Sequence, residues 1–180
     1  MKTMKKVVSA VLIGTMLISV TSCAKKFKKI DDDDLEDAFE DIFDWDEGED
    51  YRELKDYELW ATNFDDTDEP FIYDDVYYIQ GAEFNEDDWM THAYIAYSVF
   101  EEKDEADEYF VNYYNVWAKD RKDVESAYHK GSWGYYIESN EKDHFSAMYY
   151  IDDMVLEVSS YDEDGVKQVK EFLKSFGYPC

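Results

Sequence analysis

Basic residues, glycine and cysteine are all scarce in this sequence. The 180 residues include 18 Lys and Arg against 45 Asp and Glu, so the formal net charge is −27. A charge this negative repels phosphate groups and argues against nucleic acid as a partner. Seven glycines are too few for a phosphate-cradling design, and no glycine-rich nucleotide motif occurs. Nucleotide chemistry is therefore not expected.

Aromatic and aliphatic residues are plentiful in spite of the charge. Hydrophobic residues make up 45% of the chain and aromatic residues 18%. Disordered acidic chains are poor in both kinds, so the composition predicts a folded domain with an acidic, solvated surface. A chain of this length is typical of about one domain, because domains usually hold roughly 100–150 residues.

The N-terminus has the composition of an export signal. Lys2, Lys5 and Lys6 precede an uncharged, mostly apolar stretch of 14 residues from Val7 to Val20. A membrane-spanning helix needs about 20 such residues, because the hydrocarbon core is about 30 Å thick. The pattern therefore predicts a cleavable signal peptide at residues 1–22.

The signal runs into Val20-Thr21-Ser22-Cys23, which resembles the lipobox of bacterial lipoproteins, although Thr21 stands where alanine or serine is frequent. The resemblance covers residues 1–23. It implies cleavage before Cys23, covalent diacylglycerol on the sulfur as the one attached group, and a location on the extracytoplasmic face of the cell membrane. The alternative is an ordinary signal peptide with an incidental cysteine. Two acyl chains suffice for stable anchoring, because each buried CH₂ contributes about 0.8 kcal/mol.

Four lysines follow the lipobox, and we predict residues 23–30 to be a lipidated, basic linker before a single acidic domain at 31–180. Next to a bilayer these lysines can contact anionic headgroups, at about 1 kcal/mol each; alternatively they form a solvated linker. If Cys23 is lipidated, Cys180 has no intramolecular disulfide partner. It is then a free end, an intermolecular link or an inert terminus. The candidate headgroup contacts are Lys25, Lys26, Lys28 and Lys29.

Residue periodicity predicts an α+β fold, with a largely antiparallel sheet and two or three amphipathic helices packed on one face. Residues 93–100 are apolar on both sides, which places that strand centrally in the sheet. Asp152-Asp153 is a candidate two-residue turn. We expect helices at about 33–44, 106–117 and 164–176, a further helical turn at 124–128, and strands at 57–62, 76–84, 93–100, 133–137, 145–151 and 154–158.

Adjacent tyrosines in these strands must place one ring on each face of the sheet. Three such pairs are Tyr77-Tyr78, Tyr135-Tyr136 and Tyr149-Tyr150. The second face is then either covered by helices or open to a partner. Aromatic residues also fill sheet cores, so ring content alone does not predict a binding surface.

No catalytic or metal-binding motif occurs. His92, His129 and His144 lack metal-ligand spacing, and Ser132 only mimics part of a nucleophile elbow. The acidic runs 31–34 and 162–165 do not match a calcium-binding loop, and helix capping explains Asp162 to Asp164 more simply. With 45 acids, some carboxylate pair near an aromatic ring is expected by chance.

The remaining chain is similar to small, acidic, tyrosine-rich lipoproteins of Gram-positive bacteria with no assigned activity. The likeness rests on composition and on the closing segment Glu171 to Tyr178. We therefore expect a non-enzymatic binding or accessory domain of the cell envelope. Its partners would be the bilayer and an envelope protein, a glycan or a cationic ligand. The alternatives are a structural subunit of an envelope complex and an envelope-directed hydrolase that uses a carboxylate pair.

Overall fold

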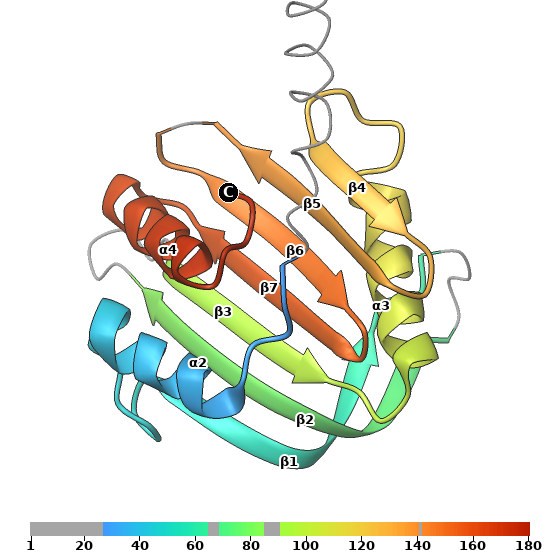
Figure 1. Cartoon of the computed structure of the whole chain (residues 1–180), viewed down its shortest axis with the longest axis horizontal. Helices are drawn as coiled ribbons and strands as arrows, with labels where there is room; N and C mark the ends of the chain where they lie inside the picture. Colours follow the sequence, from blue (N-terminus) through green and yellow to red (C-terminus); the bar gives the residue numbers. More distant parts are fainter. Residues whose placement is uncertain (1–26, 65–68, 85–90, 141) are drawn as a thin grey trace, which may run out of the picture.

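One antiparallel sheet organises the chain (Figure 1). The computed structural model describes residues 27–64, 69–84, 91–140 and 142–180. Within these ranges, seven strands pair antiparallel in the order β1-β2-β3-β7-β6-β5-β4. The strands are β1 (Tyr51–Ala61), β2 (Phe71–Phe84), β3 (Thr91–Val99), β4 (Glu125–His129), β5 (Trp133–Ser139), β6 (Phe145–Ile151) and β7 (Met154–Ser160).

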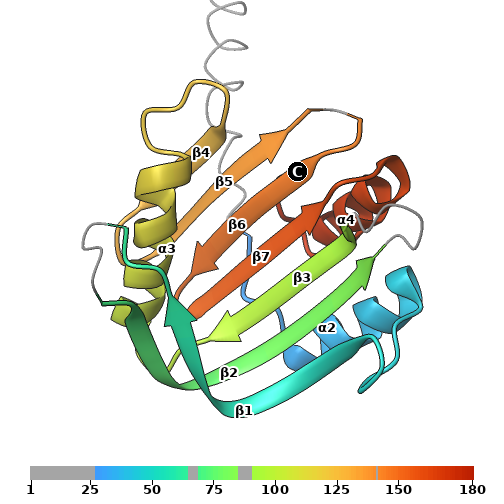
Figure 2. The same ribbon diagram turned by 180° about the vertical axis from the view of Figure 1, so that it is seen from behind.

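The helices lie on both faces of the sheet. On what we call the first face are α2 (Asp32–Ala38), its continuation η1 (Phe39–Phe43) and α4 (Glu163–Ser175). On the second face is α3 (Lys103–Trp117), which Figure 2 shows on the near side. The α+β class and the antiparallel sheet are confirmed. The expectation that the helices all pack on one face of the sheet is not confirmed, because α3 packs on the second face.

The strand sequences explain why both faces need cover. In β3, Ile95 and Tyr97 belong to the first-face core, whereas Ala96 belongs to the second-face core. The strand lies between β2 and β7, as its two apolar sides predict. The adjacent tyrosines also divide as predicted: Tyr149 packs in the first-face core and Tyr150 in the second. One helical layer could not bury both sets of side chains.

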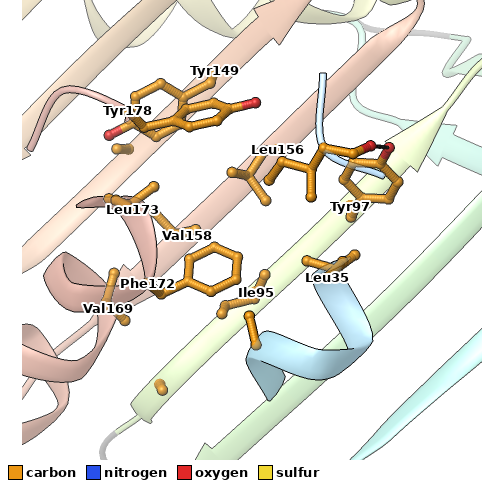
Figure 3. Close-up of a cluster of buried hydrophobic side chains, with 14 of the residues drawn as sticks. Leu35, Ile95, Tyr97, Tyr149, Leu156, Val158, Val169, Phe172, Leu173 and Tyr178 are labelled. Carbon is orange, nitrogen blue, oxygen red and sulfur yellow. Dashed lines mark hydrogen bonds between the residues drawn. The ribbon is translucent and has the colours of Figure 1, made fainter. Parts of the chain in front are cut away.

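The first-face core is the larger of the two and is shown in Figure 3. Leu35 of α2 and Phe172 of α4 approach Ile95 of β3, and all three side chains are fully buried. The hydroxyl of Tyr97 donates a 2.8 Å hydrogen bond to the carbonyl oxygen of Ile30. This bond attaches the chain before α2 to the centre of the sheet.

The second face is shaped by a bent hairpin. Strands β1 and β2 have register shifts around Tyr57, and Asp56 and Asp75 have positive φ angles of 52° and 55°. Bulges of this kind bend a strand and increase its twist. The end of β1 therefore turns toward α3 (Figure 2), and the side-chain amide of Asn112 donates a 2.7 Å hydrogen bond to the carbonyl oxygen of Thr62. The bulges also explain why simple alternation predicted only parts of these two strands.

Residues 27–30 are packed against the domain, although the sequence placed them in a linker. Phe27 is 4% exposed and Ile30 is 3% exposed. The ring of Phe27 lies 4.7 Å from the ring of Tyr178 and 5.8 Å from that of Tyr149, measured between centroids. The packed body therefore includes Phe27, at the start of the described chain.

Two connections complete the comparison with the sequence. Asp152 has a φ of 54° between β6 and β7, which confirms the turn predicted at Asp152-Asp153. The helical turn expected at 124–128 is wrong, because Glu125–His129 forms β4 and pairs with β5. The ladder of β5 supplies hydrogen bonds that local periodicity does not reveal. Across the described ranges, no helix has the length and apolarity needed to cross a membrane.

Candidate functional site

The predicted lipid-anchor residues fall on both sides of the point where the description begins. Cys23, Lys25 and Lys26 lie outside the described residues. Lys28 is exposed, and its carbonyl oxygen accepts a 2.7 Å hydrogen bond from the Tyr178 hydroxyl. Lys29 forms a 2.9 Å ion pair with Asp153. Lys28 therefore presents a solvated ammonium group, whereas the ammonium group of Lys29 is already engaged.

The three histidines are not brought together. His129 packs against Trp133 and His144 against Tyr161, with ring centroids 4.2 and 4.9 Å apart. His92 places Nδ1 2.8 Å from Asp162 and Nε2 2.7 Å from Gln168. Each histidine therefore belongs to a separate local contact.

The acidic runs also have local roles. The Asp162 side chain accepts hydrogen bonds from the backbone N–H groups of Asp164 and Gly165, so it caps α4 as expected. Asp32 to Asp34 lie in the first turn of α2, where the helix dipole favours negative charge. Within the part of the chain that the structure describes, no group of three or more His, Cys, Asp or Glu side chains is placed to hold a metal ion.

The most distinctive polar group on the sheet is Glu157 of β7. Its register partners are Ala96 of β3 and Met148 of β6, which both belong to the second-face core. Its side chain therefore stands near the centre of the second face. Although it lies in the middle of a sheet, the residue stays partly exposed, because α3 packs over only part of this face (Figure 2).

Tyrosine hydroxyls surround this carboxylate. Tyr109 of α3 donates a 2.6 Å hydrogen bond to Oε1 of Glu157. Tyr113, one turn further along α3, packs beside Tyr109, with ring centroids 5.1 Å apart. On the strand side, the side chains of Tyr78 and Tyr94 interact with each other, and both feel the charge of Glu157. We call Glu157 together with Tyr78, Tyr94, Tyr109 and Tyr113 the Tyr–Glu cluster.

The electrostatics of the cluster reflect its partial burial. Burial raises the pKa of Glu157, and the hydrogen bond from Tyr109 partly offsets this by favouring the ionised form. Burial and then the negative charge of Glu157 raise the pKa values of Tyr94, Tyr109 and Tyr113. These phenols therefore stay neutral at physiological pH.

Glu157 forms no ion pair within the described residues. The ion pairs formed by lysine, arginine and histidine in the described ranges all involve other carboxylates. Tyr109 is the hydrogen-bond partner that the structure gives to Glu157 within those ranges. A carboxylate accepts up to four hydrogen bonds, so Glu157 can accept others besides the one from Tyr109.

A second acidic region lies on the first face. Asp32 and Glu36 of α2 both have raised pKa values, first because of burial and then because of nearby carboxylates, which include Glu53 of β1. A hollow of about 490 Å³ on this side of the molecule is lined in part by Asp32 and Tyr77. Catalytic carboxylate pairs have environments that push their pKa values apart. Here both values move in the same direction.

The sequence contained one signal for the Tyr–Glu cluster that our interpretation did not use. In the strand expected at 154–158, Glu157 is the one charged residue among apolar ones. A lone charge inside a buried strand indicates a paired or functional group. Its tyrosine partners on α3 could not be found from the sequence, because they depend on where the helix packs.

No family model, curated protein or solved structure matches the chain.

Proposed function

We propose that this chain is a lipid-anchored, extracytoplasmic binding domain of the cell envelope that holds a partner at the Tyr–Glu cluster. The observation that carries the binding role is Glu157, a partly exposed residue near the centre of a sheet face that α3 covers only in part, whose carboxylate forms no ion pair within the described residues. Retaining such a group reduces stability, because burial penalises its charge. A binding role would offset that penalty.

The anchor is supported by the sequence Val20-Thr21-Ser22-Cys23. Cys23 lies only four residues before the buried ring of Phe27. Four residues span at most about 14 Å, because an extended chain advances about 3.3–3.6 Å per residue. A lipid on Cys23 would therefore hold the body close to the bilayer surface. We still propose headgroup contacts for Lys25, Lys26 and Lys28, and for Lys29 in exchange for its pair with Asp153.

The fold separates the tether from the proposed binding site. Phe27 packs in the first-face core, whereas the tyrosines around Glu157 belong to the second face. The sheet therefore lies between the point where the tether enters and the Tyr–Glu cluster.

Replacing Cys23 by Ala tests the anchor. We expect wild-type protein in the membrane fraction, with diacylglycerol on Cys23 detected by mass spectrometry of the N-terminal peptide. The Cys23→Ala protein should stay unprocessed or be released. Replacement of Cys180 by Ala is the matched control and should leave lipidation unchanged. Full membrane retention and normal processing of Cys23→Ala would refute the anchor.

No observation favours the hydrolase alternative. Glu157 is coupled to phenols, and no second carboxyl group among the described residues shifts its pKa. The first-face acids do not have the opposed pKa values that a catalytic pair needs. We therefore develop the binding function alone.

A further inference from the structure

We infer that the Tyr–Glu cluster binds a cationic side chain, an ammonium or guanidinium group, presented by a partner protein. This inference rests on the proposed binding function and specifies its ligand. The group would pair with the free oxygen of Glu157 and lie against the rings of Tyr94 and Tyr113. Both tyrosines are partly exposed beside the carboxylate.

The first argument is the missing counter-charge. Glu157 stands between Ala96 and Met148 in the sheet, and the second-face core surrounds it. In such surroundings a charge interacts more strongly than it does in water, because the effective dielectric constant is lower. No ion pair among the described residues involves Glu157, so a cation brought by a partner would supply the missing counter-charge. It would also fill hydrogen-bonding sites that Tyr109 leaves open.

The second argument is the chemistry of the neighbours. Neutral phenol rings attract organic cations through their negative faces, and such contacts contribute about 0.5–2 kcal/mol each. Calcium takes six to eight oxygen ligands and favours several carboxylates. Glu157 belongs to no such group in the described ranges. One carboxylate among aromatic rings is therefore better suited to an organic cation than to a metal ion.

The third argument is the long-range field. The chain carries a net charge of −27, which attracts cationic partners and increases their association rate, most strongly at low salt. Such steering brings a basic protein to the acidic surface but does not determine where on that surface it binds. The partly buried cluster determines the binding position, because exposed carboxylates elsewhere are solvated and screened.

The test uses the processed full-length protein in detergent and small probes of each chemistry. Butylammonium and methylguanidinium represent the two cations, and butanol is the neutral control. Binding is followed by NMR of tyrosine-labelled protein and by calorimetry. We expect saturable binding of at least one cation, with the largest shifts at Tyr94 and Tyr113 and none with butanol. The stronger of the two cations identifies the lysine-like or arginine-like ligand.

Two isosteric variants separate the site from the general charge. Glu157→Gln should weaken cation binding at least tenfold. Glu53→Gln removes the same charge from β1, where Glu53 pairs in register with Ile79 of the first-face core, and should change affinity less than twofold. Equal binding by wild type and Glu157→Gln, or equal shifts of tyrosines across the whole molecule, would overturn the inference.

If Glu157→Gln does not fold, the tyrosine chemical-shift changes of the wild-type protein test the site: they should be largest at Tyr94 and Tyr113. Failure of this inference can be distinguished from failure of the proposed anchor. If the protein is acylated and membrane-bound but binds none of the cations, this inference is refuted and the anchor is supported. If the protein is not anchored but binds the probes at Glu157, the anchor is refuted and this inference is supported.

Discussion

Replacement of Phe27 by Ala tests whether the folded body begins at the end of the tether. Phe27 is 4% exposed, and its ring contacts the rings of Trp133, Tyr135, Tyr149 and Tyr178 at centroid distances of 4.7–6.4 Å. Ala would remove all four ring contacts and leave a cavity against the sheet. The adjacent bond from Tyr178 to the carbonyl oxygen of Lys28 would also weaken.

The expected loss follows from this burial. Replacing a buried Phe by Ala typically lowers the free energy of unfolding by about 3–5 kcal/mol. Phe27 lies near the start of the packed chain, where neighbours can relax, so we expect about 3 kcal/mol. For a domain of this size, 1 kcal/mol corresponds to about 2–4 °C in Tm. The variant should therefore melt about 6–12 °C below the wild type.

Urea unfolding followed by tryptophan fluorescence measures this loss in the chain that starts at Ala24. The exposed neighbour Lys28, replaced by Ala, is the matched control and should change stability by less than about 0.5 kcal/mol. A Phe27→Ala loss as small as that of the control would refute the reasoning. Residues 27–30 would then be a detached linker, and the short tether would be wrong.

Two further predictions concern the junction of β3 and α4. Burial lowers the pKa of His92, but its bonds to Gln168 and Asp162 raise it more, so the folded pKa exceeds 6.5. The stabilisation that protonated His92 contributes is therefore complete below pH 6.5 and is lost as the pH rises through the folded pKa. The free energy of unfolding, measured between pH 6 and 8, should fall accordingly in the wild type, and His92→Gln should lack this pH dependence. Gly165→Ala makes Cβ clash with the His92 carbonyl oxygen. Calorimetry should therefore show that the free energy of unfolding falls by at least about 1–3 kcal/mol, whereas Lys167→Ala should show no such loss. A pH-independent His92 contribution, or a neutral Gly165→Ala, would contradict these contacts.

Local signals made most helices and strands predictable. Helix α4 has an Asp cap at its start and apolar residues at helical spacing, and both features depend on neighbours in sequence. The turn at Asp152 is equally local, because Asp tolerates a positive φ. Strand β3 was placed centrally because its two sides are both apolar.

Features that depend on distant segments were missed. Strand β4 forms because β5 pairs with it, and the bulges at Asp56 and Asp75 interrupt the alternation by which strands are recognised. The position of α3 on the second face depends on packing across the whole sheet. The same holds for the candidate site: Glu157 was visible as a lone charge in an apolar strand, but its partner Tyr109 lies 48 residues away.

The pKa of Glu157 with and without bound cation is the most direct test of the account. It is measured from the carboxyl carbon resonance in protein labelled at glutamate, in the absence and presence of saturating butylammonium or methylguanidinium. A cation paired with the carboxylate stabilises its ionised form, so binding should lower the pKa from its raised value. If the Glu157 titration is the same with and without each cation, the carboxylate is not the binding group and the account is contradicted.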